Sequence, residues 1–432
     1  MREMKDSGIE WIGEIPEGWK ISRIKQLFSE VIDRCENGEN YTLLSVSEYY
    51  GVAPKSERIS DDDMLTHAET LDGYKICKEN DLVMNIMLAW KRALGVSEYT
   101  GIVSPAYCVY RGKQNMCAKY FHYLFRTDMY ANLFKQYSTG IIDSRLRLYP
   151  DKFLALKCQV PPIDMQHRIA DYLDRKCSQI DSIIARQQEV IEKLKAYKLS
   201  VITEAVTKGL NPNVPMKNSG VEWIGAIPDF WDVVPLKTCS DILPGYAFSS
   251  DDFDTENGTA LLRGINVTPN GVRWEDVVYW NKPITEQLRA FELVAGDIVV
   301  GLDRPWVSGG TRVCWVTQKD LPALLLQRVC RIRAKENIDS RWIYHWIASK
   351  SFQEALSIET TGVSVPHIST KQIGQFSIAF PPIEVQRQIC DILEVKHYSI
   401  DTMVSKKQVI IDKLTEYKKS LIYEVVTGKK EV

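Results

Sequence analysis

Basic side chains that neighbour aromatic ones are the residues of this sequence best suited to chemistry with another molecule. Arg304 and Trp306 lie in the segment LDRPW, and a Trp-Lys-Arg run occupies the matching place in the first half. Arg and Lys beside aromatic residues in loops can position phosphates and contact base edges. We therefore predict a DNA-binding surface with these candidates: Trp90, Lys91, Arg92, Arg145, Arg147, Arg304, Trp306, Arg312, Arg328 and Arg331.

A structural role is an equally weighted alternative for each candidate. Trp90 and Trp306 would then be packed anchors, and the arginines would be solvated ends of strands. The formal net charge of −2 also limits what the chain can do alone, because phosphate neutralisation supplies much of the affinity for nucleic acid. We therefore expect a basic partner subunit to contribute to binding.

The sequence contains none of the patterns that mark common catalytic sites. It has no G-x-x-x-x-G-K-[ST] loop for ATP and no H-E-x-x-H zinc pattern. Glu394 and Lys396 resemble the end of a nuclease motif, but no Pro-Asp pair precedes them suitably, so we interpret them as surface charges. The ten cysteines form no C-x-x-C pair, which is typical of reduced, buried thiols. We expect no catalytic residue, no metal site and no cofactor on this chain.

Length and composition indicate a globular protein with more than one domain. The chain has 432 residues, 45% hydrophobic and 25% charged, and its length predicts two to four domains. No apolar run reaches the ~18 residues of a membrane span. The N-terminus MREMKDSG lacks the apolar segment of a signal peptide. We expect a cytoplasmic protein with no membrane contact.

Two segments of the sequence occur twice, and we call them the frame. The opening phrase SGIEWIGEIPEGWK at 7–20 returns as SGVEWIGAIPDFWD at 219–232, and PPIDMQHRIADYLDRKCSQID at 161–181 returns as PPIEVQRQICDILEVKHYSID at 381–401. The middles match only faintly, as in NDLVMNIMLAW (80–90) against GDIVVGLDRPW (296–306). We predict that the frame performs one task twice and that the middles perform related but different tasks. The alternative, that only core residues were retained, explains the matching surface residues less well.

Each frame helix shows an apolar seam that recurs every seven residues. The period predicts helices over about 164–207 and 384–427, each ended by a glycine. A helix of about 42 residues spans roughly 63 Å at ~1.5 Å per residue. Gln187 and Lys407 interrupt the two seams at matching positions. The predicted seam residues are Leu173, Ile180, Ile184, Ile191, Leu194, Leu393, Ile400, Val404, Ile411 and Leu414.

Connectivity determines the direction of the helices. The first helix leaves the first middle and arrives at the second, so a paired second helix must return antiparallel. We predict a mixed α/β fold: two globular domains separated by two long antiparallel helices, a coiled coil with pseudo-two-fold internal repeat. The predicted segments are 1–160, 161–215, 216–380 and 381–432, and short helices are expected at 117–136 and 340–357. Separate packing of each helix on its own domain is the alternative.

The frame resembles the specificity subunits of type I restriction-modification systems. The resemblance rests on the Trp-Ile-Gly-x-Ile-Pro-x-x-Trp phrase and on PPIDMQ and PPIEVQ, each present once per half; most members have Glu-Gln where this chain has Met165-Gln166 and Val385-Gln386. It implies two target recognition domains that read a bipartite, asymmetric site in double-stranded DNA. It also implies two adenine-N6 methyltransferase subunits and restriction subunits as partners, with adenosylmethionine, ATP and Mg²⁺ bound by those partners.

Two other functions stay open at this point. The chain could be a self-contained DNA-modifying enzyme with an unrecognised site, or a structural bridging protein without a DNA role. The divergent middles and the arginine-aromatic loops favour the specificity subunit. For the opening phrase, we expect a position at the edge of each globular domain, against the helix that returns from the other half.

Overall fold

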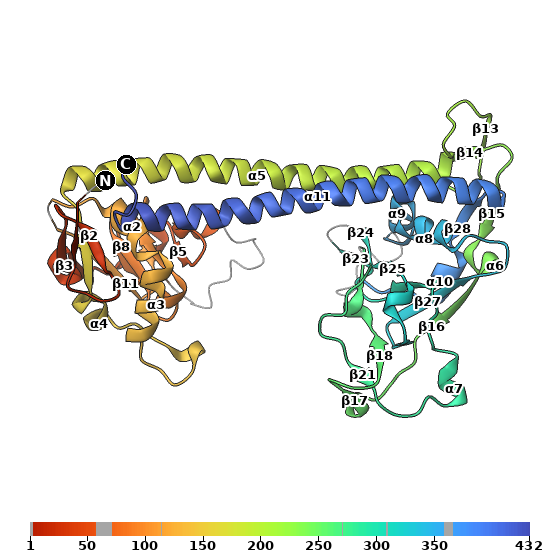
Figure 1. Cartoon of the computed structure of the whole chain (residues 1–432), viewed down its shortest axis with the longest axis horizontal. Helices are drawn as coiled ribbons and strands as arrows, with labels where there is room; N and C mark the ends of the chain where they lie inside the picture. The colour runs from red at the N-terminus through yellow and green to blue at the C-terminus, as the bar shows by residue number, and fades with distance from the viewer. Residues whose placement is uncertain (1–2, 58–70, 114, 270, 308–309, 358–365) are drawn as a thin grey trace. The chain divides into compact units, whose positions relative to one another are not determined.

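The computed structural model describes residues 3–57, 71–113, 115–269, 271–307, 310–357 and 366–432. The chain forms two compact units. Unit 1 contains Met1–Arg186 and Ile410–Val432, and unit 2 contains Gln187–Val409. Helices α5 (Ile163–Lys208) and α11 (Ile383–Val426) are each continuous and belong in part to both units (Figure 1). The units therefore cut across the four segments predicted from the sequence, because each long helix packs in both of them.

A four-stranded antiparallel sheet in the order β4-β11-β8-β9 forms the centre of unit 1. Strands β3 and β12 pair at the two ends of the domain's sequence, where Lys20 lies opposite Val160. The strands are β1 Met4–Asp6, β2 Glu14–Pro16, β3 Lys20–Arg23, β4 Phe28–Val31, β5 Leu44–Ser47, β6 Gly51–Pro54, β7 Lys75–Cys77, β8 Leu82–Asn85, β9 Leu94–Val96, β10 Gly101–Val103, β11 Tyr107–Gly112 and β12 Lys157–Val160. The helices are α1 Ile24–Leu27, α2 Ala118–Phe125, α3 Asp128–Tyr137 and α4 Pro150–Ala155.

Unit 2 repeats this arrangement and adds a second sheet. The sheet β16-β27-β22-β25 is antiparallel throughout, and β15 pairs with β28 as β3 does with β12. The additional sheet, β17-β21-β18-β26, contains a parallel pair. Most strands are β13 Met216–Asn218, β14 Ala226–Pro228, β15 Asp232–Pro235, β16 Ser240–Pro244, β17 Phe253–Asp254, β18 Thr259–Leu262, β21 Tyr279–Trp280, β22 Ile298–Gly301, β25 Val313–Trp315, β26 Ala323–Leu325, β27 Val329–Ala334 and β28 Ser377–Phe380. Short pairs β19 Val267–Thr268 with β20 Gly271–Val272, and β23 Trp306–Val307 with β24 Gly310–Thr311, complete the set, and the helices are α6 Leu236–Cys239, α7 Glu286–Arg289, α8 Ser340–Ala348, α9 Lys350–Ser357 and α10 Thr370–Gln375.

The two segments expected to be helical each form two short helices. The segment 117–136 forms α2 and α3, and 340–357 forms α8 and α9. At each break a side-chain hydroxyl caps the second helix: Thr127 accepts from the backbone of Tyr130, and Ser349 accepts from that of Phe352. A hydroxyl that satisfies a free N–H favours a new helix start over continuation.

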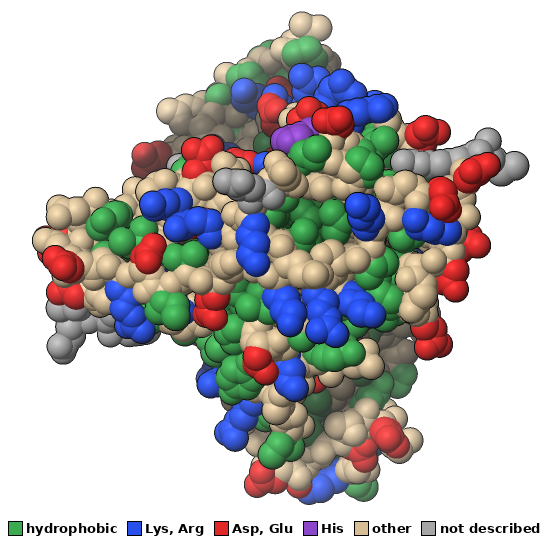
Figure 2. Space-filling view, turned by 90° about the vertical axis from the view of Figure 1, so that its left-hand side faces the viewer, with side chains coloured by type: hydrophobic (Ala, Val, Ile, Leu, Met, Phe, Trp, Pro, Cys, Tyr) green, Lys and Arg blue, Asp and Glu red, His purple; other side chains and the backbone are tan. Residues whose placement is uncertain are grey.

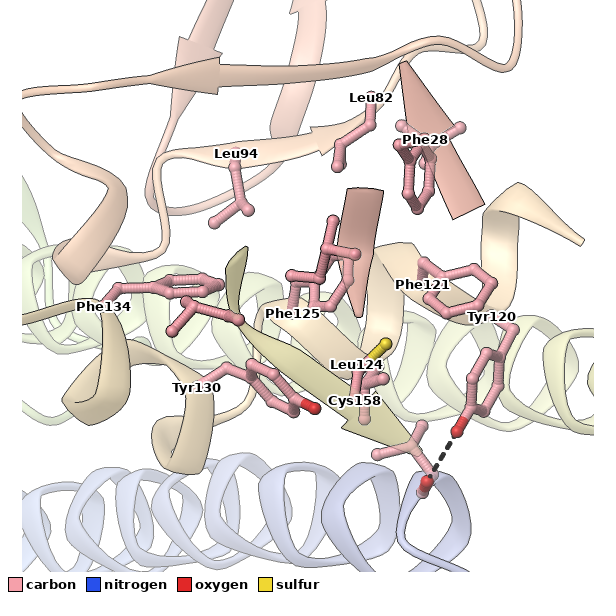
Figure 3. Packing of buried hydrophobic residues seen from close by; sticks show 14 of the residues in the cluster. Phe28, Leu82, Leu94, Tyr120, Phe121, Leu124, Phe125, Tyr130, Phe134 and Cys158 are labelled. Carbon is pink, nitrogen blue, oxygen red and sulfur yellow. Dashed lines mark hydrogen bonds between the residues drawn. The ribbon is translucent and has the colours of Figure 1, made fainter. Parts of the chain in front are cut away.

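Aromatic side chains fill the core of unit 1. Phe121 and Phe125 of α2 contact Phe28 of β4, with ring centroids 5.5 and 6.3 Å apart (Figure 3). Such pairs add about 0.5–1.5 kcal/mol beyond their area burial. Tyr120 points its hydroxyl toward α11 and donates a 3.0 Å hydrogen bond to the backbone oxygen of Val426. The domain is thereby fixed to the last turn of α11.

The two long helices run antiparallel within each unit. In unit 1, Asp181 accepts a 2.6 Å hydrogen bond from Lys418, and Arg168 donates to the backbone of Val432. In unit 2, Lys198 is 2.8 Å from Asp401, and Lys407 donates to the side-chain oxygen of Gln187 at 2.9 Å. The residue numbers of these contact partners fall as the residue numbers along α5 rise. The two polar interruptions of the seams therefore meet each other.

Apolar packing supports the same helix pairing. Leu173 and Ile180 lie in one buried cluster with Leu421 and Val425 in unit 1, and Leu393 joins Ile202 in unit 2. Of the ten predicted seam residues, those fully buried are Leu173, Ile180, Ile191, Leu393, Ile400 and Ile411. Ile184, Leu194, Val404 and Leu414 are half-buried. The predicted mixed α/β fold with a paired helical spacer is confirmed.

A glutamine in each repeated PPI motif joins the long helix to its domain. The buried Gln166 side chain accepts from the backbone of Cys117 at 2.9 Å and donates to that of Pro161 at 2.9 Å. Gln386 makes the same pair of bonds, from Asp339 and to Pro381. A buried amide with both ends satisfied fixes the angle of the helix to its domain. This explains why the motif recurs with its spacing intact.

The opening phrase of each half covers the end of a helix from the other half. In unit 1, a Cβ on Gly428 at the end of α11 would lie 2.4 Å from Pro16 and 3.1 Å from Trp19. In unit 2, a Cβ on Gly209 at the end of α5 would lie 3.2 Å from Trp231. Both glycines have positive φ, +76° and +75°. The phrase therefore has the position expected from the sequence. Within the described ranges, no helix combines the length and apolar character that crossing a membrane requires.

Candidate nucleic-acid interface

Equivalent loops meet where an inner strand of the central sheet ends, β8 in unit 1 and β22 in unit 2. In unit 1, the backbone N–H of Leu148 donates to Ile86, just after β8, at 2.9 Å. In unit 2, Ile368 makes the same bond to Leu302, just after β22, at 2.9 Å. These bonds join the candidates near 86–92 to the segment that contains Arg145 and Arg147. We call the two joined loops of each unit its loop pair: 86–92 with 138–148, and 302–306 with 366–368.

Trp90 anchors the unit 1 loop pair. Its indole N–H donates to the backbone of Met87 at 3.1 Å, and its ring packs against the core. The ammonium groups of Lys91 and Lys135 lie over the ring, 5.2 and 4.9 Å from its centroid. Arg92 has φ of +68° and an ion pair with Asp128 at 2.5 Å. Trp90 thus holds two cations at the surface, while Arg92 is already paired.

Arg145 and Arg147 are exposed on the second loop of the unit 1 pair. Thr139 and Arg147 exchange two backbone hydrogen bonds, at 2.9 and 3.0 Å, so the loop closes on itself. Leu146 and Leu148 are buried and fix it to the domain. Neither arginine side chain forms an ion pair with any residue that the structure describes. Both guanidinium groups can donate hydrogen bonds to a phosphate without breaking an ion pair to a described residue.

Asp303 organises the unit 2 loop pair. Its carboxylate is 2.6 Å from Nδ1 of His367 and 3.5 Å from the guanidinium of Arg328, which is 74% exposed. Arg304 is exposed, with φ of +45°, and its N–H donates to Pro366 at 2.8 Å. A residue in this strained region of φ is held there by its surroundings. The Arg304 side chain is therefore presented outward by a fixed backbone.

Two predicted contacts of unit 2 belong to the fold instead. Arg331 is 6% exposed and donates to the backbone of Ala290 and to Asp241, at 3.1 and 2.6 Å. Arg312 donates to the backbone of Val267 and Asp303, and burial lowers the pKa of its guanidinium. A phosphate contact would have to break these bonds first. We therefore remove both from the proposed interface.

Trp306 has an anchoring role comparable to that of Trp90. It is half-buried in β23, and its ring meets Phe352 edge to face at 6.2 Å. The alternative of a packed anchor thus describes both tryptophans. Lys135, Asp303 and His367 contact the candidate residues or their loops but are not themselves candidates. The sequence alone does not indicate that α3 and the 366–368 segment approach these loops.

Charges of both signs are mixed on one face of the molecule. On the face drawn in Figure 2, Lys and Arg side chains lie among Asp, Glu and hydrophobic side chains. This distribution agrees with the near-neutral formal charge of −2. Affinity for DNA would therefore depend on a few placed cations and on partner subunits more than on a broad basic field.

The remaining nucleophiles and potential ligands are placed as structural residues. All ten cysteines are free and buried, and burial raises the pKa of Cys77 to about 12 and that of Cys239 to about 11. A thiol with so high a pKa is a poor nucleophile at neutral pH. Within the described part of the chain, no three His, Cys, Asp or Glu side chains are grouped to hold a metal ion.

Comparisons with known proteins agree with this architecture. A family model described as "Type I restriction modification DNA specificity domain" matches residues 228–411. The MjaVIII specificity subunit of Methanocaldococcus jannaschii is 27% identical over 431 residues, 96% of this chain and 93% of that protein. The EcoAI specificity subunit of Escherichia coli is 29% identical over 202 residues, 46% of this chain and 34% of that protein.

The fold is also shared with a solved structure. A chain described under "Structural basis underlying complex assembly and conformational transition of the type I R-M system" has a TM-score of 0.70 at 14% identity, covering 96% of this chain and 99% of that one. The chain thus combines two α/β units with a repeated helical frame, and each unit carries a loop pair with at least one exposed arginine. Over residues 228–411 by the family model, and over 96% of its length by the MjaVIII relative, the chain is similar to the specificity subunits of type I restriction-modification systems.

Proposed function

We propose that the chain is such a specificity subunit, in which each globular domain reads one half of a bipartite, asymmetric site in double-stranded DNA. The carrying observation is that both units join the same two loops through the same backbone bond, Leu148 to Ile86 and Ile368 to Leu302, at 2.9 Å in each case. The side chains on the two loop pairs differ: unit 1 has Lys91, Arg145 and Arg147, whereas unit 2 has Arg304, with Arg328 beside it in an ion pair with Asp303. Two loop pairs with the same backbone connection but different side chains are suited to bind two related but different targets.

The proposal extends to protein partners. The helical frame would hold two copies of an adenine-N6 methyltransferase subunit and recruit restriction subunits, with adenosylmethionine, ATP and Mg²⁺ bound by those partners. The frame is repeated in detail, including the buried Gln166 and Gln386 with their hydrogen bonds. Such a repeat can bind two identical partners. In unit 2, α11 exposes Ile392, Val395 and Tyr398 at 41%, 72% and 77%, on one side of the helix by their spacing. Grouped exposed apolar residues favour a protein contact.

Mapping methylated adenines in DNA from cells that carry the system tests the proposal directly. We expect two different short half-sites separated by a nonspecific spacer, lost when the gene for this chain is deleted. Methylation by the purified chain alone with adenosylmethionine would instead establish a self-contained enzyme. A reconstituted complex without salt-dependent DNA binding would favour a structural bridge.

A further inference from the structure

The tip of the loop 138–148 of unit 1 carries two exposed isoleucines. Ile141 is 100% exposed and Ile142 is 52% exposed. Single exposed apolar residues are common and need no explanation. Here, however, two adjacent ones occupy the tip of a loop whose other apolar residues, Leu146 and Leu148, are buried. The loop therefore sorts its apolar side chains into anchors and an outward tip.

The tip is held in place by local hydrogen bonds. Thr139 and Arg147 are joined by two backbone bonds, and the N–H of Arg145 donates to the backbone oxygen of Ile142 at 2.8 Å. Gly140 allows this closure, because a Cβ there would lie 2.6 Å from the backbone oxygen of Arg145. A tip that is already ordered loses little conformational entropy when it binds.

The surroundings of the tip are positively charged. Lys135 is 2.8 Å from Asp143 on the loop and lies over the ring of Trp90. Arg145 and Arg147 add two exposed cations, whereas Asp143 is the one acid on residues 138–148. An apolar tip between arginines is complementary to a DNA groove, where phosphates line the rim and base edges and methyl groups form the floor.

We propose that Ile141 and Ile142 enter a groove of the DNA and contact the bases, while Arg145 and Arg147 contact the flanking phosphates. This proposal rests on the proposed function of unit 1 as a half-site reader and names the residues that read. Apolar side chains recognise the thymine methyl group or pack against an opened base step. The charge around the tip favours DNA over a protein partner.

The test uses the chain assembled with its methyltransferase subunits, a duplex that contains the mapped methylation motif, and a duplex with the unit 1 half-site scrambled. The double variant Ile141→Ser/Ile142→Ser removes the apolar tip. Ile32→Ser is the matched control, because Ile32 is also exposed on unit 1, at 64%. A second variant, Arg145→Gln/Arg147→Gln, removes the predicted phosphate contacts.

We expect the serine double variant to lose roughly tenfold in affinity for the motif, with unchanged affinity for the scrambled duplex, and Ile32→Ser to match wild type. The glutamine variant should weaken binding to both duplexes and reduce the salt slope by about 2. Wild-type affinities from the serine variant in an intact complex, or its failure to assemble with the methyltransferase, would overturn the proposal. A wild-type complex without preference for the motif would instead refute the proposed function itself.

Discussion

Arg304 and Arg331 are arginines of the same unit whose guanidinium groups meet opposite surroundings. Arg304 is exposed on a fixed backbone, whereas Arg331 is buried against Asp241. We expect Arg304→Ala to weaken specific DNA binding by about 1–3 kcal/mol if its side chain contacts a base edge. If it contacts phosphate alone, specific and nonspecific binding should fall together. Binding titrations at several salt concentrations distinguish these results, and unchanged binding by a folded variant would exclude the loop from the interface.

Arg331→Ala should act on stability instead. The substitution removes the hydrogen bonds to Ala290 and Asp241 and leaves space in the core, so we expect the free energy of unfolding to fall by about 2 kcal/mol. Chemical denaturation measures the loss. Exposed Arg328→Ala serves as the control, with a change within about 0.5 kcal/mol. Equal stability of the two variants would contradict the structural role of Arg331.

The buried His345 predicts acid sensitivity. Its ring is 5.2 Å from that of His397, and neither of its nitrogens has a hydrogen-bond partner among the described residues. Burial lowers the pKa of His345 well below its ordinary value and that of His397 to about 4, with Lys198 adding to the effect. The folded protein therefore keeps both rings neutral, while the unfolded chain takes up protons near roughly pH 6.5. Stability should fall as the pH drops from about 6.5 toward 4.

The first repeat suggests the variant that tests this pH effect. Tyr120 and Trp342 make equivalent contacts to Trp19 and Trp231, which places Tyr123 at the position of His345. We expect His345→Tyr to reduce the loss of melting temperature between pH 7.5 and pH 5. His167→Tyr, on the exposed face of α5, should retain the wild-type loss. Equal pH dependence in all three proteins would show that His345 is not responsible.

At the residue scale, the sequence predicted the location of the loops but not which side chains are free. The Trp-Lys-Arg and Asp-Arg-Pro-Trp segments do lie in the joined loops. Proximity in sequence groups Arg331 with Arg328, but in β27 the Arg331 side chain points toward Asp241 on the neighbouring strand β16. Lys135 and Ile141 become notable only when α3 and the loop are seen together.

Antiparallel pairing of α5 and α11 places Gln187 against Lys407, and this contact has a measurable consequence. A polar pair in an apolar seam costs stability and specifies the register of the helices. We expect Gln187→Leu/Lys407→Leu to raise the free energy of unfolding by about 1 kcal/mol. Gln188→Leu, at an exposed position beside it, is the control. Destabilisation by the double variant, measured by denaturation, would show that the polar contact contributes net stability.

The glycine at the end of α11 tests the contact with the opening phrase. Gly428→Ala combines a φ of +76° with a Cβ 2.4 Å from Pro16, whereas Gly13→Ala has a φ of +72° and open space. We expect the Gly13 variant to cost about 1 kcal/mol from backbone strain, and the Gly428 variant to cost clearly more. Thermal denaturation of both variants isolates the packing contribution. Equal losses would mean that the phrase does not hold the helix end.

At the element scale, periodicity predicted the long helices closely. The expected 164–207 and 384–427 compare with Ile163–Lys208 and Ile383–Val426, because an uninterrupted heptad seam leaves few alternatives. The breaks at Thr127 and Ser349 were not predicted. Each depends on a hydroxyl that caps the next helix, and a hydroxyl inside an apolar run can equally well face solvent.

For the whole molecule, exchange of one domain should change one half-site. Residues 20–160 begin and end on the paired strands β3 and β12, where Lys20 lies opposite Val160, so a foreign domain can be joined without leaving strands unpaired. We expect the methylated motif to change in one half and keep the other. The replacement should retain an aromatic hydroxyl at the position of Tyr120, which holds α11. A change in both halves would refute the assignment of one reader to each domain.

Each unit contains the end of a long helix that belongs to the other repeat, and this exchange suggests how the protein evolved. Unit 1 is completed by residues 410–432, and unit 2 by residues 187–208 of the other repeat. A half-length ancestor with a single repeat would have left the face around its Trp19 uncovered, and only the helix end of a second copy could cover it. Such a protein would have been an obligate homodimer bound to a palindrome. Duplication and fusion of such a gene would have released the two domains from symmetry, and an asymmetric target would then have been possible without any change in the scaffold.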